Sequence, residues 1–166
     1  MPSLKDLRNR ITSVKSTQKI TQAMKMVAAA KLRRAQMAME AAKPFSRKLE
    51  LLLARLSRSE TAQKHPLFQS RSHMDLPPLY VLFTSDRGLA GAFNANLIKA
   101  AERELRKHPN ALLYCVGRKG RDYFKKRIGA RLVGETIPGG VLDGEITDAI
   151  ANRLLEVWES GAVREI

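Results

Sequence analysis

The feature that most limits how this chain can fold is a long stretch without glycine. Between Ser3 and Leu56 there is no glycine and one proline, Pro44, and good helix formers dominate. Ser3 is suited to cap the N-terminus of a helix. A helix over these residues would be roughly 80 Å long, and we expect Pro44 to kink it or to divide it into two segments. A helix of this length needs a coiled-coil partner or a surrounding sleeve.

The apolar residues of this stretch do not stay on one side of the helix. The first four follow the three-four spacing of a coiled-coil seam: Leu4, Leu7, Ile11 and Val14. The next seam positions are polar, and at about 100° per residue three later apolar residues project to the opposite side: Ile20, Met24 and Val27. Four more return toward the first side: Ala28, Leu32, Ala35 and Met39. The middle of the helix therefore presents apolar groups in more than one direction.

The charge of the chain is concentrated in the same region. The formal net charge is +14, and residues 1–60 hold 14 Lys and Arg against 4 Asp and Glu. One interpretation is a helix buried on two sides within its own domain. The other is a rod held by several partners, some of them acidic, and this fits better because so many unpaired cations cannot enter a neutral core.

Residues 57–78 are polar, contain three prolines and are predicted to be a linker. His65 and His73 fall in this segment. No cysteine or acidic cluster accompanies them, so we interpret them as surface histidines rather than metal ligands.

After the linker, strands and helices alternate. The predicted strands are residues 78–85, 111–117 and 130–136, and the predicted helices are residues 94–109, 118–129 and 143–161. Asn94 is the expected cap of the first of these helices, and Pro109 its stop. Alternation of this kind predicts an open, largely parallel sheet with flanking helices, an α/β fold. The last residues, "AVREI", begin a further strand-like segment, so we expect the sheet to be truncated.

No stretch of the chain predicts catalysis. The loop "SDRGLAGAFN" (85–94) lies where a phosphate loop would lie, but Gly88 and Gly91 lack the required glycine order and no Gly-Lys-Ser/Thr motif follows. We interpret it as a tight strand-to-helix turn, with Asp86 and Arg87 as a surface pair. A basic run in residues 118–127 is interpreted as a solvated helix face with Tyr123 and Phe124 packed inward.

The remaining composition restricts the cellular setting. The single cysteine, Cys115, is expected in a buried strand, which excludes an internal disulfide and fits a reducing compartment. No uncharged apolar run approaches the ~20 residues of a membrane span. The N-terminus lacks the apolar core of a signal peptide, so we expect no cleaved targeting segment.

Three motifs resemble one known family. The segment "LKDLRNRITSVKSTQKITQAMKMVAAAKLRRAQ" resembles the N-terminal helix of the gamma subunit of F-type ATP synthases. The segments "LFTSDRGLAGAFNANL" and "GRKGRDYF" resemble the first two strand-helix units of that subunit's central domain. Ala90 stands where many members carry a cysteine.

The resemblance implies a central rotor stalk, the function we expect for this chain. In that family a long N-terminal and a long C-terminal helix form an antiparallel coiled coil inside a ring of alpha and beta subunits. A Rossmann-like domain lies beside the foot of the stalk, near the epsilon subunit and the membrane ring of c subunits. Catalytic residues belong to beta, so the resemblance implies no cofactor, no nucleotide and no catalytic residue here. The setting would be the cytoplasmic side of a bacterial inner membrane.

The resemblance also assigns roles to individual residues. The seam residues Leu4, Leu7, Ile11 and Val14 would pack on the C-terminal helix. The residues that would face an acidic segment of the beta subunit are Lys19, Met24, Lys25 and Lys31. The expected organisation is a shaft helix over 1–56, a linker over 57–78 and a Rossmann-like domain over 79–166.

Family members continue past residue 166, so this chain resembles the N-terminal portion, a fragment without the C-terminal helix. Two other hypotheses stay open from the residues alone. The basic charge would suit a nucleic-acid-binding protein, although no reading motif is present. The glycine turn would suit a nucleotide-dependent enzyme.

Overall fold

The computed structural model describes residues 3–69, 71, 74–140 and 143–166. The chain divides into two compact units, Met1–Gln63 and Lys64–Ile166, which we call the helical unit and the α/β unit.

The helical unit is dominated by a single helix, α1, over Leu4–Leu56. Its N-terminus is closed by a capping box, in which the Ser3 hydroxyl accepts from the Asp6 amide and the Asp6 carboxylate accepts from the Ser3 amide. This confirms the predicted cap. None of the 53 residues of α1 is buried.

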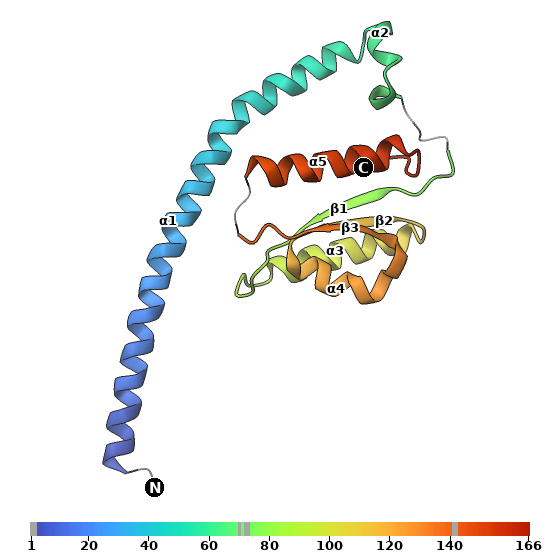
Figure 1. The fold of residues 1–166 in the computed structure, drawn as a ribbon. Coiled ribbons are helices and arrows are strands. Elements are labelled where there is room, and N and C mark those ends of the chain that lie inside the picture. The colour runs from blue at the N-terminus through green and yellow to red at the C-terminus, as the bar shows by residue number, and fades with distance from the viewer. Residues whose placement is uncertain (1–2, 70, 72–73, 141–142) are drawn as a thin grey trace. The chain divides into compact units, whose positions relative to one another are not determined.

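Pro44 does not divide α1. The helix continues through it, and the ribbon curves over the half that contains this residue (Figure 1). Proline removes one backbone donor and its ring crowds the carbonyl of Glu40, four residues earlier, which bends a helix toward the side away from the ring. A bend suffices here because α1 is exposed along its whole length, so the freed carbonyl can bind water.

The segment between α1 and the sheet has more structure than a polar linker. It contains a short helix, α2 (Glu60–Gln63), and a single 3-10 turn, η1 (Pro66–Phe68). His65 caps η1, with Nδ1 accepting from the Leu67 amide at 3.3 Å. The other histidine of this segment, His73, lies outside the described residues.

The α/β unit is built on three parallel strands, β1 (Leu79–Phe83), β2 (Leu112–Val116) and β3 (Leu132–Thr136), in the order β1-β2-β3. Each lies within two residues of its predicted position. The strands are continuous apolar runs in β1 and β2 because both faces of the sheet are covered.

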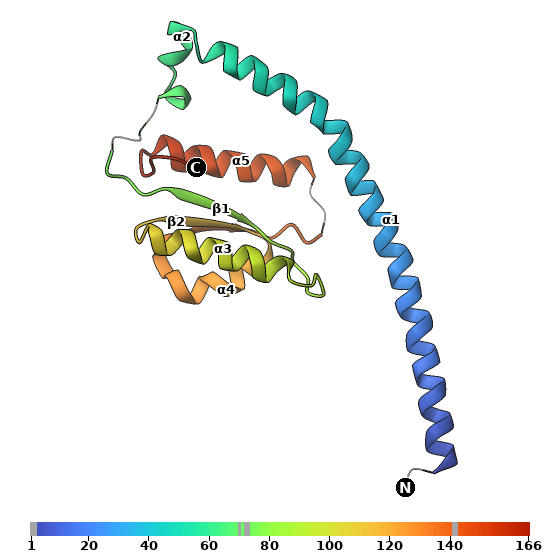
Figure 2. The same ribbon diagram turned by 180° about the vertical axis from the view of Figure 1, so that it is seen from behind.

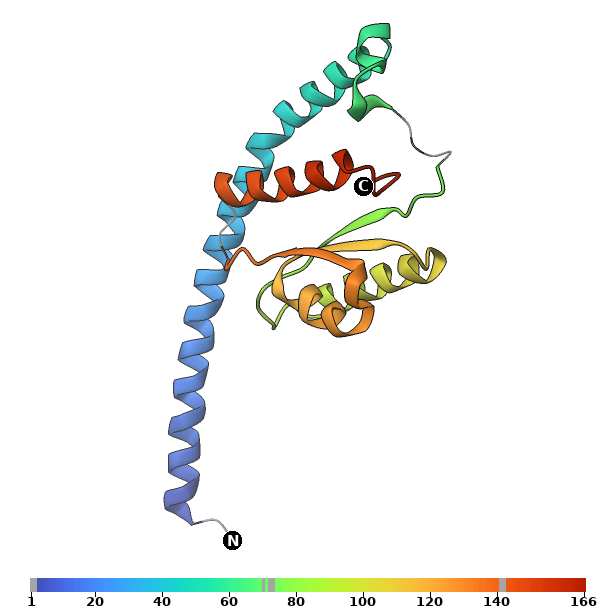
Figure 3. The ribbon, with the colours of Figure 1, turned by 45° about the vertical axis from the view of Figure 1, so that its right-hand side comes forward.

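The helices of this unit lie on two sides of the sheet. Helix α5 (Gly144–Glu159) covers one face, and α3 (Phe93–Lys107) and α4 (Arg118–Ile128) cover the other, as Figures 2 and 3 show from two directions. One apolar cluster, around Leu79, Tyr114 and Ile150, lies beneath α5. A second, around Leu113, Cys115 and Phe124, lies beneath α3 and α4. This arrangement confirms the predicted α/β class with an open parallel sheet and flanking helices.

The expected fourth strand is represented by one bridge. Glu165 pairs with Pro78 in parallel orientation, on the edge of β1 that faces away from β2. The Leu79 amide donates to the Glu165 carbonyl at 2.9 Å.

Candidate functional site

The exposed surface of α1 is the first candidate site. The predicted seam residues, Leu4, Leu7, Ile11 and Val14, are between 45% and 77% exposed. On a continuous helix they fall within about 80° of one another. They therefore form one apolar stripe, which we call the seam, and it has no covering element in the part of the chain that the structure describes.

The four residues predicted to meet an acidic partner do not share one face of α1. Met24 and Lys31 are seven residues apart and lie within about 20° of each other. Lys25 and Lys19 are rotated from Met24 by about 100° and about 140°, in opposite directions. The structure therefore brings Met24 and Lys31 together and distributes the other two lysines around the helix.

The cations of α1 form no ion pair within the described residues. The ion pairs found there lie in the α/β unit and involve no α1 side chain. The positive charge of α1 is thus available to an external surface.

The threonines of α1 satisfy their hydroxyls internally. Thr12, Thr17 and Thr21 each donate to the carbonyl four residues earlier, at 2.9 to 3.0 Å. Their side chains consequently add little free hydrogen-bonding capacity to the helix surface, and they offer methyl groups instead.

The loop after β1 is the second candidate site, and it is bound to the N-terminus of α4. The Asp86 carboxylate accepts from the Arg118 amide at 2.9 Å, and the Thr84 hydroxyl accepts from the Gly120 amide at 2.8 Å. The Lys119 amide donates to the Ser85 carbonyl at 3.1 Å. Asp86 therefore caps α4 rather than forming the surface pair that we predicted with Arg87.

Asn94 does not cap α3, so that prediction was wrong. The helix starts one residue earlier, at Phe93, with Ala92 at the cap position and no capping side chain. The Asn94 amide group instead closes the loop, accepting from the Ser85 amide at 3.0 Å and donating to the Ser85 hydroxyl at 2.8 Å. A tertiary contact of this kind outweighs the local preference of asparagine for a cap.

These bonds bear on the possibility of phosphate binding. A phosphate site at a helix N-terminus needs free backbone N–H groups. At α4 the first three amides already donate to Asp86, Ser85 and Thr84. The N-terminus of α4 therefore has no free amide among its first three residues to offer a phosphate.

The tip of the same loop projects outward. Leu89 is 101% exposed and has a φ of 62°, a left-handed conformation that is uncommon for a leucine. Sequence reasoning gave no role to Leu89, and no local pattern marks it.

The basic run of α4 is only partly solvated. Arg121 and Lys125 pair with Glu135 at 3.3 and 3.6 Å. Phe124 is buried as predicted, whereas Tyr123 is partly exposed and donates its hydroxyl to Glu102 at 2.6 Å. That hydrogen bond to a carboxylate raises the pKa of Tyr123.

Cys115 is fully buried, as predicted, in the middle of the sheet. Burial, with a smaller contribution from the nearby Glu135 carboxylate, raises the pKa of its thiol to about 11. Within the described ranges there is no cluster of three or more potential metal-ligating side chains. No helix in those ranges is both long and apolar enough to cross a membrane.

Comparison with known proteins identifies the family. The family model described as ATP synthase matches residues 3–166. The chain belongs to the gamma-chain family of ATP synthases. The ATP synthase gamma chain of Heliobacterium modesticaldum is 40% identical over 167 residues, covering 100% of this chain and 57% of the relative. The gamma chain of Acidiphilium cryptum is 44% identical over 168 residues, covering 97% of this chain and 57% of the relative.

A solved structure agrees in fold. The rotor of the Euglena gracilis mitochondrial ATP synthase, determined by cryo-electron microscopy in rotational state 1, matches with a TM-score of 0.54 and 17% identity. The match covers 90% of this chain and 51% of that chain. The chain thus spans somewhat more than half the length of these gamma-chain relatives.

Proposed function

We propose that this chain forms the N-terminal part of the central rotor stalk of an ATP synthase, with α1 as one helix of the shaft. The observation that carries the proposal is the surface of α1. A helix of 53 residues without a buried side chain cannot be stable by its own packing, because helices depend on burial of an apolar face. The helix therefore needs other protein surfaces to pack against. Because its apolar and its cationic groups point in several directions, these surfaces must lie on more than one side of it.

We assign the neighbours by chemistry. The seam matches a second helix of the same stalk, packed as a coiled coil. The exposed Met24 and the adjacent Lys31 match an acidic surface on a catalytic beta subunit, and Lys19 and Lys25 match other parts of the surrounding ring. Alpha and beta subunits would form that ring, whereas the α/β unit would lie toward the epsilon subunit and the c-subunit ring. We assign the complex to the cytoplasmic side of a bacterial inner membrane.

The contacts proposed for α1 suit a part that turns. Every deep energy minimum between a shaft and its sleeve would be a barrier to rotation. Exposed methionine and alanine make adaptable apolar contacts, and exposed cations attract an acidic ring while contributing little net affinity. The threonine hydroxyls of α1 are bonded to its own backbone, which reduces the number of specific bonds to be broken at each step. We propose that the chain is non-catalytic and that ATP is made or hydrolysed on beta.

Assembly tests this proposal. Residues 1–166 replace the matched region of the Heliobacterium modesticaldum gamma chain, and the chimera is co-expressed with the alpha and beta subunits of that organism. We expect the chimeric chain to purify with alpha and beta subunits as a single copy, in a smaller number than either of them, measured by native mass spectrometry. A chimera that folds but purifies without alpha and beta would refute the proposal.

A further inference from the structure

Part of the segment between α1 and β1 is bonded to α5. Residues 64–69 and 71, which we call the anchor segment, belong to the α/β unit. Two side chains of this segment are bonded to its own backbone. His65 caps η1, and the Gln69 side chain donates to the Lys64 carbonyl at 3.3 Å. The anchor segment therefore has a defined local structure, although its sequence is that of a polar linker.

Arg71 joins the anchor segment to the last turn of α5. Its Nη1 donates to the Trp158 carbonyl at 2.6 Å and to the Val163 carbonyl at 3.4 Å. Its guanidinium carbon lies 4.1 Å from the centre of the Trp158 ring. The Arg71 side chain is partly buried in making these contacts. One planar cation thus combines charge-assisted hydrogen bonds with a cation–π contact at a single place.

Helix α5 supplies no cation for its own C-terminal end. Its last turn contains no basic residue, whereas Glu156 and Glu159 lie there. The unpaired carbonyls at the C-terminus of a helix carry partial negative charge, which a nearby cation stabilises. Arg71, which is 87 residues from Trp158 along the chain, provides that cation. The attachment is therefore favourable at this end of α5 in particular.

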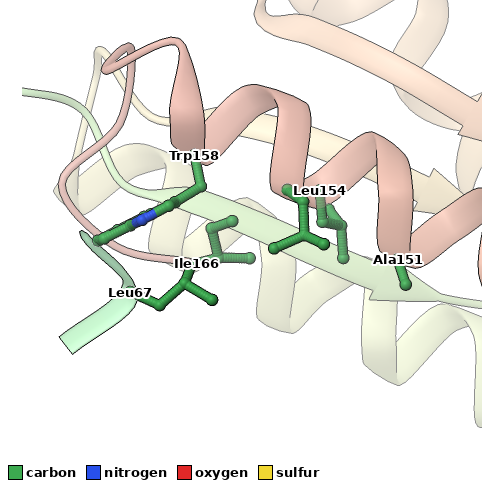
Figure 4. Close-up of a pocket in the computed structure, with 6 residues that line it drawn as sticks. Leu67, Ala151, Leu154, Trp158 and Ile166 are labelled. Carbon is green, nitrogen blue, oxygen red and sulfur yellow. The ribbon is translucent and has the colours of Figure 1, made fainter. Parts of the chain in front are cut away.

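Leu67 makes the apolar part of the same attachment. It lines a groove of about 490 Å³ together with Leu154 and Trp158 of α5. Figure 4 shows the Leu67 side chain on the side of α5 where the Trp158 ring lies. Leu67 remains 52% exposed, so the closer attachment is the one that Arg71 makes.

We propose that Arg71 is a positioning residue of the rotor. It fixes the anchor segment to α5, so that force passing along the chain from α1 enters the α/β unit at the C-terminal end of α5. An unattached polar segment behaves as a flexible chain and straightens before it transmits force. A segment held by Arg71 transmits force without that delay. This inference rests on the proposed rotor function and adds the residue through which the load passes.

Release of the anchor segment is measured first, in the 166-residue chain. Arg71→Ala removes both hydrogen bonds and the ring contact. The Phe68 and Gln69 amides donate to the His65 and Pro66 carbonyls within η1. We expect these two amides to exchange about tenfold faster, the change that follows from losing a charged hydrogen bond and a cation–π contact. The emission of Trp158, the one tryptophan, should shift to the red as its ring becomes exposed.

Arg131→Ala is the matched control. Arg131 also donates from Nη1 to a backbone carbonyl at 2.6 Å, but its acceptor is Pro109, between α3 and β2. This variant should leave the exchange of the η1 amides and the Trp158 emission unchanged. Arg71→Lys keeps the charge without the planar fork of donors, so it should fall between the parent chain and Arg71→Ala in both measurements.

The load is measured in the chimeric gamma chain, assembled with alpha and beta subunits that are fixed to a surface. A bead is attached to the α/β unit through Lys99→Cys on α3, and its angular variance is recorded while the rotor is paused without ATP. The variance is inversely proportional to the torsional stiffness between the fixed ring and the bead. Arg71→Ala should raise it at least about twofold, because a locally opened segment carries no load. Arg131→Ala should leave it unchanged.

Two results would overturn the inference. One is an Arg71→Ala chain whose Phe68 and Gln69 amides exchange as slowly as in the parent. The other is an Arg71→Ala rotor that turns with ATP and keeps the parent's angular variance, or one that loosens no more than Arg131→Ala does. A parent chimera that assembles but does not turn would instead refute the rotor function on which this inference rests.

Discussion

Close approaches of backbone to backbone set the residue-scale constraints in the α/β unit. Gly117 follows β2 with a φ of 101°, and a Cβ built there would lie 2.0 Å from the Thr84 carbonyl oxygen. The same Thr84 accepts from Gly120 through its hydroxyl. The turn after β1 and the start of α4 are thus held in contact because residue 117 has no side chain.

Replacing Gly117 should destabilise the α/β unit. We expect Gly117→Ala to lower the free energy of unfolding of the α/β unit by more than about 2 kcal/mol, since it combines a clash with a strained backbone. The measurement is urea denaturation followed by Trp158 fluorescence. Gly88→Ala is the control, because a Cβ at Gly88 would meet only the Lys119 side chain at 4.0 Å. Equal stabilities of the two variants would contradict the described turn.

The buried thiol gives a second residue-scale prediction. With its pKa raised to about 11, Cys115 should be unreactive toward iodoacetamide at pH 8 in the folded chain and should react fully in urea. The unfolded thiol ionises near its ordinary value of 9.0. The contribution of Cys115 to stability is therefore complete below about pH 9 and is lost as the pH rises toward 11. Fast labelling of the native chain at pH 8 would show that Cys115 is accessible.

At the scale of elements, the sequence predicted the strands and helices that short-range patterns encode. The continuous apolar runs of β1 and β2 and the helical periodicity of α5 placed these elements to within about two residues. The capping box of α1 was partly foreseen, because Ser3 lies at the start of a long glycine-free stretch.

Contacts between distant residues could not be predicted in this way. Asp86 caps a helix that begins 32 residues later, and Asn94 bonds back to Ser85, so neither role has a local signal. Helical geometry could have separated Lys19 and Lys25 from Met24, because their rotation about the axis follows from residue number alone. The pairing of Glu165 with Pro78 could not be predicted either, because no pattern in "AVREI" specifies which residue it pairs with.

The element-scale prediction concerns the face of α1 that carries Met24. When the chimera is assembled into the complete ATP synthase in membrane vesicles, Met24→Lys should leave the subunit stoichiometry unchanged while lowering the number of protons pumped per ATP hydrolysed. The reason is that a new cation beside Lys31 adds either repulsion or an overly strong ion pair at a contact that must slide. Met26→Lys is the matched control, since Met26 is similarly exposed and is rotated by about 160° from Met24. Unchanged coupling in Met24→Lys, or equal losses in both variants, would count against Met24 as a torque contact.

At the scale of the whole molecule, the two units should differ in cooperativity. The α/β unit has two apolar clusters, whereas α1 has no buried residue. We therefore expect the isolated chain to lose helical circular dichroism over a broad range at low temperature, before the α/β unit unfolds in a sharper transition reported by Trp158. Coincident transitions by the two signals would mean that α1 is stabilised within the isolated chain.

The central claim is that α1 belongs to a turning shaft, and rotation tests it most directly. The chimeric gamma chain carries Lys99→Cys, an exposed position on α3, as the attachment point for a bead, because the buried Cys115 should not compete for the label. It is assembled with alpha and beta subunits fixed to a surface and supplied with ATP. We predict continuous rotation of the bead in one direction that stops when ATP is removed. Particles of full subunit composition that hydrolyse ATP while the bead stays still would contradict the account.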